Sequence, residues 1–111
     1  MQSQRKQTKD QVAQLKQRML PILNIPIIVT FGPHKFSTVI EDIVQARLAD
    51  LINKPERREE NGIFYTPTTV TFHCSNGKLH FILDDIDSIV QTLAGIMFHM
   101  RGGMDVCFIC Q

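Results

Sequence analysis

Apolar positions recur near the N-terminus at helical spacing. Val12, Leu15, Met19 and Ile22 follow one another at intervals of three and four residues, with mainly glutamine and lysine between them. This is the a/d pattern of an amphipathic helix, which we predict over residues 7–20. Two heptads are only marginally stable alone in water. The apolar stripe must therefore pack either on this domain or on a second copy of it.

Two further segments show a helix-like stripe. Thr38 and Glu41 have the spacing of a capping box and begin the first of them. The second follows a cluster of aspartates, with Asp85 as the predicted N-cap and Gly102 as the predicted C-cap. The apolar positions of the two stripes are Ile40, Ile43, Val44, Leu48, Leu51 and Ile52, and Ile86, Ile89, Val90, Leu93, Ile96, Met97 and Met100.

The remaining apolar segments are short and predict strands at residues 27–31, 68–74, 79–83 and 106–110. The last of these is apolar on both faces, which is typical of a covered strand. Asn76-Gly77 separates the two central strands and favours a type I′ hairpin turn.

That turn would fix the register of the hairpin. It places Phe72 opposite Phe81 on the core face, and His73 opposite His80 on the outer face.

The predicted order is a helix followed by β-α-β-β-α-β. This order matches the ferredoxin-like, split βαβ pattern of the α+β class, in which two helices cover one face of a four-stranded antiparallel sheet. We assign residues 1–24 to a basic amphipathic N-terminal helix and residues 25–111 to a single α+β domain, with a charged loop at residues 54–62.

Composition indicates an ordinary globular chain. It has 111 residues, of which 43% are hydrophobic and 21% charged, enough for one domain. The first residues are polar and no apolar run approaches the roughly 18 residues of a membrane span. We therefore expect a cytoplasmic or nuclear protein without membrane association, with its three cysteines as thiols.

Charge is unevenly distributed. Residues 1–20 carry five basic side chains and one acidic side chain, whereas the rest of the chain carries seven basic and ten acidic ones. A basic segment on a mildly acidic body is compatible with an acidic partner or nucleic acid, but we favour the simpler interpretation, a solvated helix that keeps the protein in solution.

No motif for catalysis, nucleotide binding or a cofactor is present, and we predict that the chain is not an enzyme. Ser37, Ser75 and Ser88 lack the context of an activated nucleophile. His73 and His80, if opposed, could share a metal ion, but two imidazoles need at least one more ligand to form a zinc site. We interpret them as half-exposed sheet residues and predict no metal.

The sequence predicts a protein-interaction or assembly module, because the apolar surface exceeds what a four-stranded sheet needs. It would self-associate or bind a protein partner through the N-terminal helix and the open sheet face. The residues proposed to carry this contact are Val12, Leu15, Met19, Ile22 and Ile82.

The alternative is a single-stranded RNA-binding domain with the topology of an RNA-recognition motif. Its contacts would come from Arg5, Lys6, Lys9, Lys16, His73 and His80.

Overall fold

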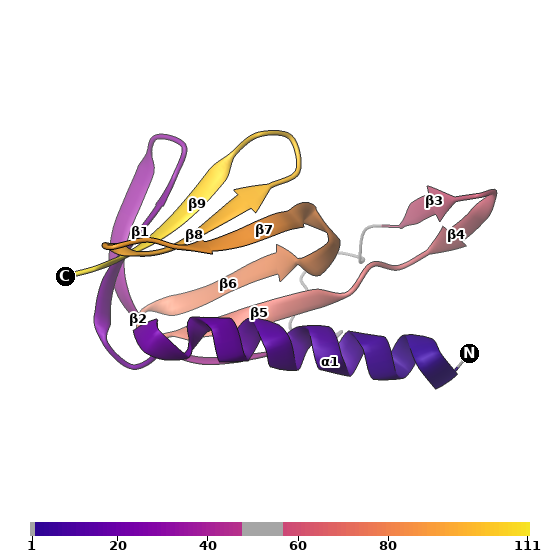
Figure 1. Ribbon diagram of the computed structural model, residues 1–111, viewed down its shortest axis with the longest axis horizontal. Coiled ribbons are helices and arrows are strands. Elements are labelled where there is room, and N and C mark those ends of the chain that lie inside the picture. The colour runs from indigo at the N-terminus through magenta and orange to yellow at the C-terminus, as the bar shows by residue number, and fades with distance from the viewer. Residues whose placement is uncertain (1, 48–56) are drawn as a thin grey trace.

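In the computed structural model, one helix and a strongly bent antiparallel sheet make up residues 2–47 and 57–111, the part of the chain that the structure describes (Figure 1). In α1, side chains are described from residue 10 onward. The elements are α1 (Gln2–Met19), η1 (Leu20–Ile22), β1 (Pro26–Phe31), β2 (His34–Gln45), β3 (Arg58–Glu60), β4 (Ile63–Tyr65), β5 (Thr69–Cys74), β6 (Gly77–Ile82), η3 (Leu83–Asp85), β7 (Ile86–Gln91), β8 (Gly95–Met100) and β9 (Asp105–Cys110).

Seven strands form the main sheet in the order β6-β5-β2-β1-β9-β8-β7, and β3 and β4 form a separate hairpin. The main sheet bends until strands from its two halves meet. The rings of Phe72 on β5 and Phe108 on β9 are 5.9 Å apart, and those of Phe81 on β6 and Phe98 on β8 are 5.7 Å apart. The edge strands β6 and β7 are joined through η3.

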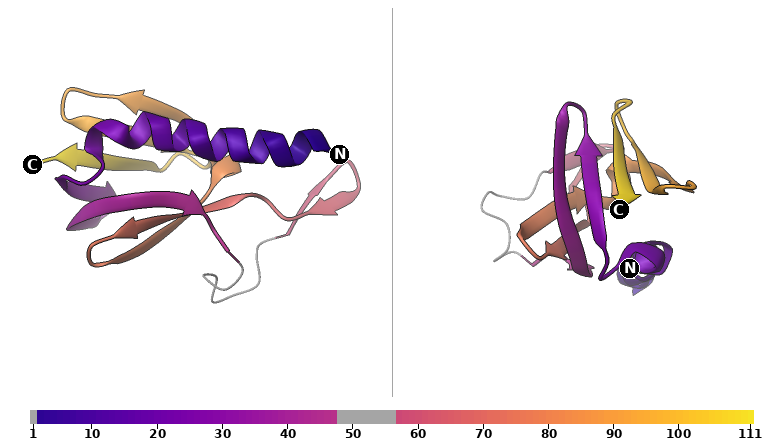
Figure 2. Two further views of the ribbon diagram at one scale, coloured as in Figure 1. Left: turned by 90° about the horizontal axis from the view of Figure 1, so that it is seen from below. Right: turned by 90° about the vertical axis from the view of Figure 1, so that its left-hand side faces the viewer.

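The core lies inside this bend. α1 lies alongside the sheet and closes its open side (Figure 2), so residues of the helix and of both halves of the sheet share one apolar cluster. Its buried members are Leu15, Met19, Ile22, Ile27, Val29, Ile40, Ile43, Val70, Phe72, Ile96, Phe98, Val106 and Phe108. No helix in the described part of the chain is long and apolar enough to cross a membrane.

The N-terminal helix is confirmed, although it begins at Gln2 and not at residue 7, but the ferredoxin-like α+β prediction is wrong. The fold is mostly β. Where the first inner helix was predicted, the structure has the long strand β2. Three residues of that predicted helix, Leu48, Leu51 and Ile52, lie outside the described residues. The second predicted inner helix is the hairpin β7–β8.

Two β-bulges explain why these strands have helix-like spacing. The pairing of β2 with β5 shifts between Ile40 and Asp42, and the pairing of β7 with β8 shifts between Ile86 and Ser88. A bulge adds one residue to a strand, so inward side chains that would be two positions apart become three apart. Ile40 and Ile43 therefore both face the core, as do Ile86 and Ile89.

The residues predicted to cap these helices have other roles. Thr38 is buried in β2 and its hydroxyl donates to the side-chain oxygen of Asn76. Asp85 lies in η3 and pairs with Arg58 at 2.8 Å. Gly102 lies in the turn between β8 and β9, with φ of 93°.

The predicted register of the central hairpin is also wrong, by two residues. Cys74 pairs with Gly77, so the turn residues are Ser75 and Asn76 rather than Asn76 and Gly77. A shift of two residues leaves every side chain on its original face. Phe72 and Phe81 accordingly both pack in the core, as predicted, with ring centroids 4.9 Å apart.

Candidate interaction surfaces

The apolar stripe of α1 packs on this domain, the first of the two arrangements that its sequence allowed. Leu15, Met19 and Ile22 are at most 3% exposed, and Val12 is partly buried against the same core. Ile82 is half-buried and pairs with Thr69 across β5 and β6. A surface that binds a partner must therefore lie mainly outside this stripe.

Two basic residues of α1 make contacts within the chain. Lys16 lies 2.7 Å from a carboxylate oxygen of Asp42, and the hydrogen bond from its ammonium group lowers the pKa of that carboxyl. Arg18 donates to the backbone carbonyl of Ile89 on β7. The side chains of Arg5, Lys6 and Lys9 lie outside the described part of the helix.

His73 and His80 both lie on the outer face, but they are not opposite each other. His73 pairs with Lys78, while His80 pairs with Thr71, whose hydroxyl is 2.9 Å from the His80 Nδ1 atom. Within the described ranges, no three histidine, cysteine, aspartate or glutamate residues are grouped as metal ligands. RNA binding through these residues stays a prediction.

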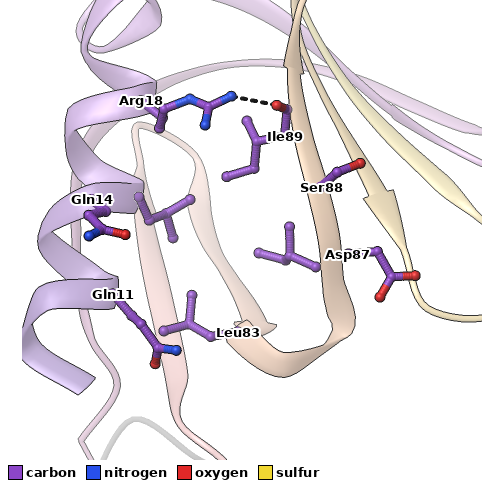
Figure 3. Close-up of a pocket in the computed structure, with 9 residues that line it drawn as sticks. Gln11, Gln14, Arg18, Leu83, Asp87, Ser88 and Ile89 are labelled. Carbon is purple, nitrogen blue, oxygen red and sulfur yellow. Dashed lines mark hydrogen bonds between the residues drawn. The ribbon is translucent and has the colours of Figure 1, made fainter. Parts of the chain in front are cut away.

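A cleft of about 280 Å³ separates α1 from β7 (Figure 3). Gln11 and Arg18 reach into it from the helix, and the contact between Arg18 and Ile89 bridges it. Asp87 and Ser88 extend from the side of β7 away from α1. The free edge of β7 is thus reached from the helix by the Arg18 side chain, across the cleft.

Ser88, His99 and Asp105 form a row across β7, β8 and β9, because Ser88 pairs with His99 and His99 with Asp105. The His99 Nδ1 atom is 2.8 Å from an Asp105 carboxylate oxygen. Nucleophilic catalysis would require the serine hydroxyl to donate to the other ring nitrogen, and donors for an oxyanion. In the described part of the chain, no hydrogen bond joins the Ser88 hydroxyl to His99. The row therefore supports no catalytic role on its present geometry.

An apolar patch covers the outer face of the sheet over β1, β9, β8 and β7. In register, Val90 lies beside Met97 and Met97 beside Cys107, and in the next row Ile109 lies beside Ile28. These five residues, the outer patch, point away from the core that α1 covers, and Val90 is 39% exposed.

The margins of the outer patch are mainly polar. Lys35 ends the row of Val90 on the β2 side, because Thr30 pairs with both Cys107 and Lys35. His99 and Asp105 form the next row along β8 and β9, on the side of the patch away from Ile109. At the turn between β7 and β8, Leu93 is fully exposed. An apolar centre with a polar border is typical of a protein contact surface.

The β3–β4 hairpin, residues 58–65, projects away from the main sheet and is here called the arm (Figure 1). Its turn is Asn61-Gly62, with φ of 53° and 79°, the positive values that a type I′ turn requires. Ile63 and Phe64 are 70% and 62% exposed. The Arg57 guanidinium lies 5.7 Å from the centroid of the Phe64 ring.

An apolar pocket of about 390 Å³, the end pocket, lies between β6 and the turn that joins β8 to β9. Phe31, Phe81, Met100 and Met104 are among its apolar lining residues, and Arg101 and Asp85 are among its charged ones. Asp85 also holds Arg58, so the base of the arm is fixed beside the wall of this pocket.

The three cysteines differ in accessibility. Burial raises the pKa of the Cys74 thiol, which donates to the Phe72 carbonyl oxygen at 3.6 Å, whereas Cys110 is exposed. Because the thiolate is the reactive form, iodoacetamide at neutral pH should alkylate Cys110 at least about tenfold faster than Cys74. Peptide mass spectrometry over a time course measures both rates, and in urea the difference should vanish. Faster alkylation of Cys74 in the folded protein would contradict this placement.

Comparison of the chain with protein-family models, curated proteins and solved structures returned no match. Function must therefore be inferred from the surfaces of this chain. Of these, sequence reasoning missed the arm and the end pocket. Asn61-Gly62 between Glu60 and Ile63 was the one signal for the arm, since Asn-Gly flanked by strand-like residues indicates a hairpin.

Proposed function

We propose that this chain is a non-enzymatic protein-interaction module whose outer patch binds the apolar face of a protein partner. The observation that carries the proposal is the two adjacent rows of apolar side chains on the outer face, one across β7, β8 and β9 and the other across β9 and β1. A sheet face exposed to water normally alternates apolar inward and polar outward residues. Here β9 is apolar on both faces, with Val106 and Phe108 inward and Cys107 and Ile109 outward.

The chemistry of the patch defines the partner that fits it. Five apolar side chains spread over four neighbouring strands suit a broad apolar surface better than an extended peptide. Lys35 at the margin favours an acidic residue on the partner at that side. Electrostatic complementarity of this kind determines orientation and association rate more than affinity.

A photo-crosslinking amino acid at position 97, in full-length protein expressed in cells, tests the proposal. Met97 lies in the middle of the patch. The same amino acid at position 17, an exposed position on α1, serves as the control. We expect one specific protein adduct from position 97 that position 17 does not give.

The crosslinked protein is then purified and titrated against the unmodified chain. Met97→Lys should weaken this binding at least about tenfold, because a charge replaces an apolar contact at the centre of the interface. Gln17→Lys should leave it unchanged. Identical adducts from positions 97 and 17, or equal affinities for the two variants, would refute the proposal. An adduct of twice the mass of the chain would identify the partner as a second copy.

A further inference from the structure

We propose that the arm docks into the end pocket of a second copy of this chain, so that two copies assemble by exchanging arms. This inference uses a different surface from the outer patch and does not depend on it. It accounts for two features at once: a projecting hairpin with two exposed apolar side chains, Ile63 and Phe64, and an apolar pocket that the described residues leave open.

The arm is short for a hairpin that stands alone. Each of its strands has three residues, and isolated two-stranded hairpins are marginally stable in water. Its two apolar residues, Ile63 and Phe64, are adjacent in β4 and therefore point to opposite faces. Docking on a second molecule would remove at least one of them from water.

The two faces of the arm differ in their relation to the body of the molecule. Arg58, which pairs with Asp85, shares a face with Glu60, Ile63 and Tyr65, so this face turns toward the body at the base of the arm. The other face carries Glu59 directly beside Phe64. That face presents an aromatic ring next to a carboxylate.

The end pocket has the complementary arrangement. Its lining is mainly apolar, and its volume of about 390 Å³ is large enough for a phenyl ring. Met100 and Met104 are flexible side chains that can adjust around a ring. Arg101 supplies a cation beside the apolar lining, while the charge of Asp85 is compensated by Arg58. Phe64 would enter the pocket, where it exchanges its contact with Arg57 for the apolar lining, and Glu59 would pair with Arg101.

The position of the base of the arm makes a reciprocal exchange geometrically consistent. Asp85 both lines the end pocket and holds the arm through Arg58, so in each copy the tip lies about one arm length from its own pocket. A strand of three residues spans roughly 10 Å. When the tip of one copy reaches the pocket of its partner, a two-fold axis brings the partner's tip to the first pocket. Such an isologous contact closes as a dimer.

Sedimentation velocity on the full chain over a range of concentrations tests this inference. We expect a dimer whose dissociation constant rises at least about tenfold in Phe64→Ser, because an exposed ring is lost without a change in the core. Glu59→Lys and Arg101→Glu should each weaken the dimer, and the double variant should restore it. Glu60→Lys makes the same charge change on the opposite face of the arm and should leave the dimer intact.

Restoration by the double variant separates a specific pair from general damage to the fold. A wild-type chain that stays monomeric at millimolar concentration would overturn the inference, as would a dimer that survives Phe64→Ser. A dimer lost in Met97→Lys but kept in Phe64→Ser would assign self-association to the outer patch and equally overturn arm exchange. If Met97→Lys lost partner binding but kept the arm-dependent dimer, the result would support both proposals.

Discussion

Gly95→Ala is expected to destabilise the protein by more than about 3 kcal/mol, which is a large part of the roughly 5–15 kcal/mol that stabilises a domain. A Cβ atom at this position would lie 1.9 Å from the carbonyl oxygen of Phe108. Phe108 is fully buried in β9, and Gly95 pairs with its neighbour Ile109. The oxygen can therefore retreat only if the β8–β9 ladder moves. Urea unfolding followed by circular dichroism measures the loss.

Gly77→Ala is the matched control. Gly77 has φ of 151° and Gly95 has φ of 158°, so the backbone cost of adding a side chain is similar at the two positions. Among the described residues, nothing lies within 4 Å of a Cβ atom built on Gly77. This variant should lose only about 1–3 kcal/mol of stability, the cost of holding an alanine in this backbone conformation. Equal losses in the two variants would show that the contact with Phe108 does not determine the effect.

The sequence predicts α1 correctly because its signals agree. Its apolar positions are three and four residues apart, and its other positions hold good helix formers such as glutamine and lysine. In β2 and β7 the signals conflict. The spacing of Ile40 and Ile43 favours a helix, while the abundance of β-branched residues favours a strand. A bulge produces the misleading spacing, and a single sequence does not reveal a bulge.

The central hairpin shows how a tertiary contact overrides a local turn preference. Asn76 accepts a hydrogen bond from Thr38 and donates one, at 2.9 Å, to the Ser37 carbonyl, so its side chain ties the turn to β2. Both partners are more than 35 residues away in sequence. Asn61-Gly62, which makes no such contact with β2 among the described residues, forms the two-residue turn that local rules predict.

The candidate surfaces could be predicted in part. The apolar residues on both faces of β9 indicated surplus apolar surface, and the structure places one face in the core and the other in the outer patch. The end pocket could not be predicted, because it depends on the sheet bending until β6 approaches the β8–β9 turn. That bend brings together residues such as Phe31, Phe81 and Met104, which are too far apart in the sequence to form a local pattern.

Met19→Asp is expected to unfold most of the protein, with a loss of at least about 4 kcal/mol of stability. The variant tests whether the α1 stripe packs in the core of this domain or binds another molecule. Met19 is 0% exposed and packs in the central core. A carboxylate placed there without a partner has to be desolvated or take up a proton, and both are costly. Thermal unfolding and urea titration, read by circular dichroism, should show a strongly weakened or absent transition.

Gln17→Asp introduces the same charge two residues earlier, at an exposed position on the same helix. Its stability should stay within about 0.5 kcal/mol of the wild type, as for most surface substitutions. A Met19→Asp protein that kept its stability and only changed its oligomeric mass would show that the stripe binds another molecule. Because the helix closes the open side of the sheet, we expect instead that its loss exposes the core that both halves of the sheet share, and that helix and sheet unfold together.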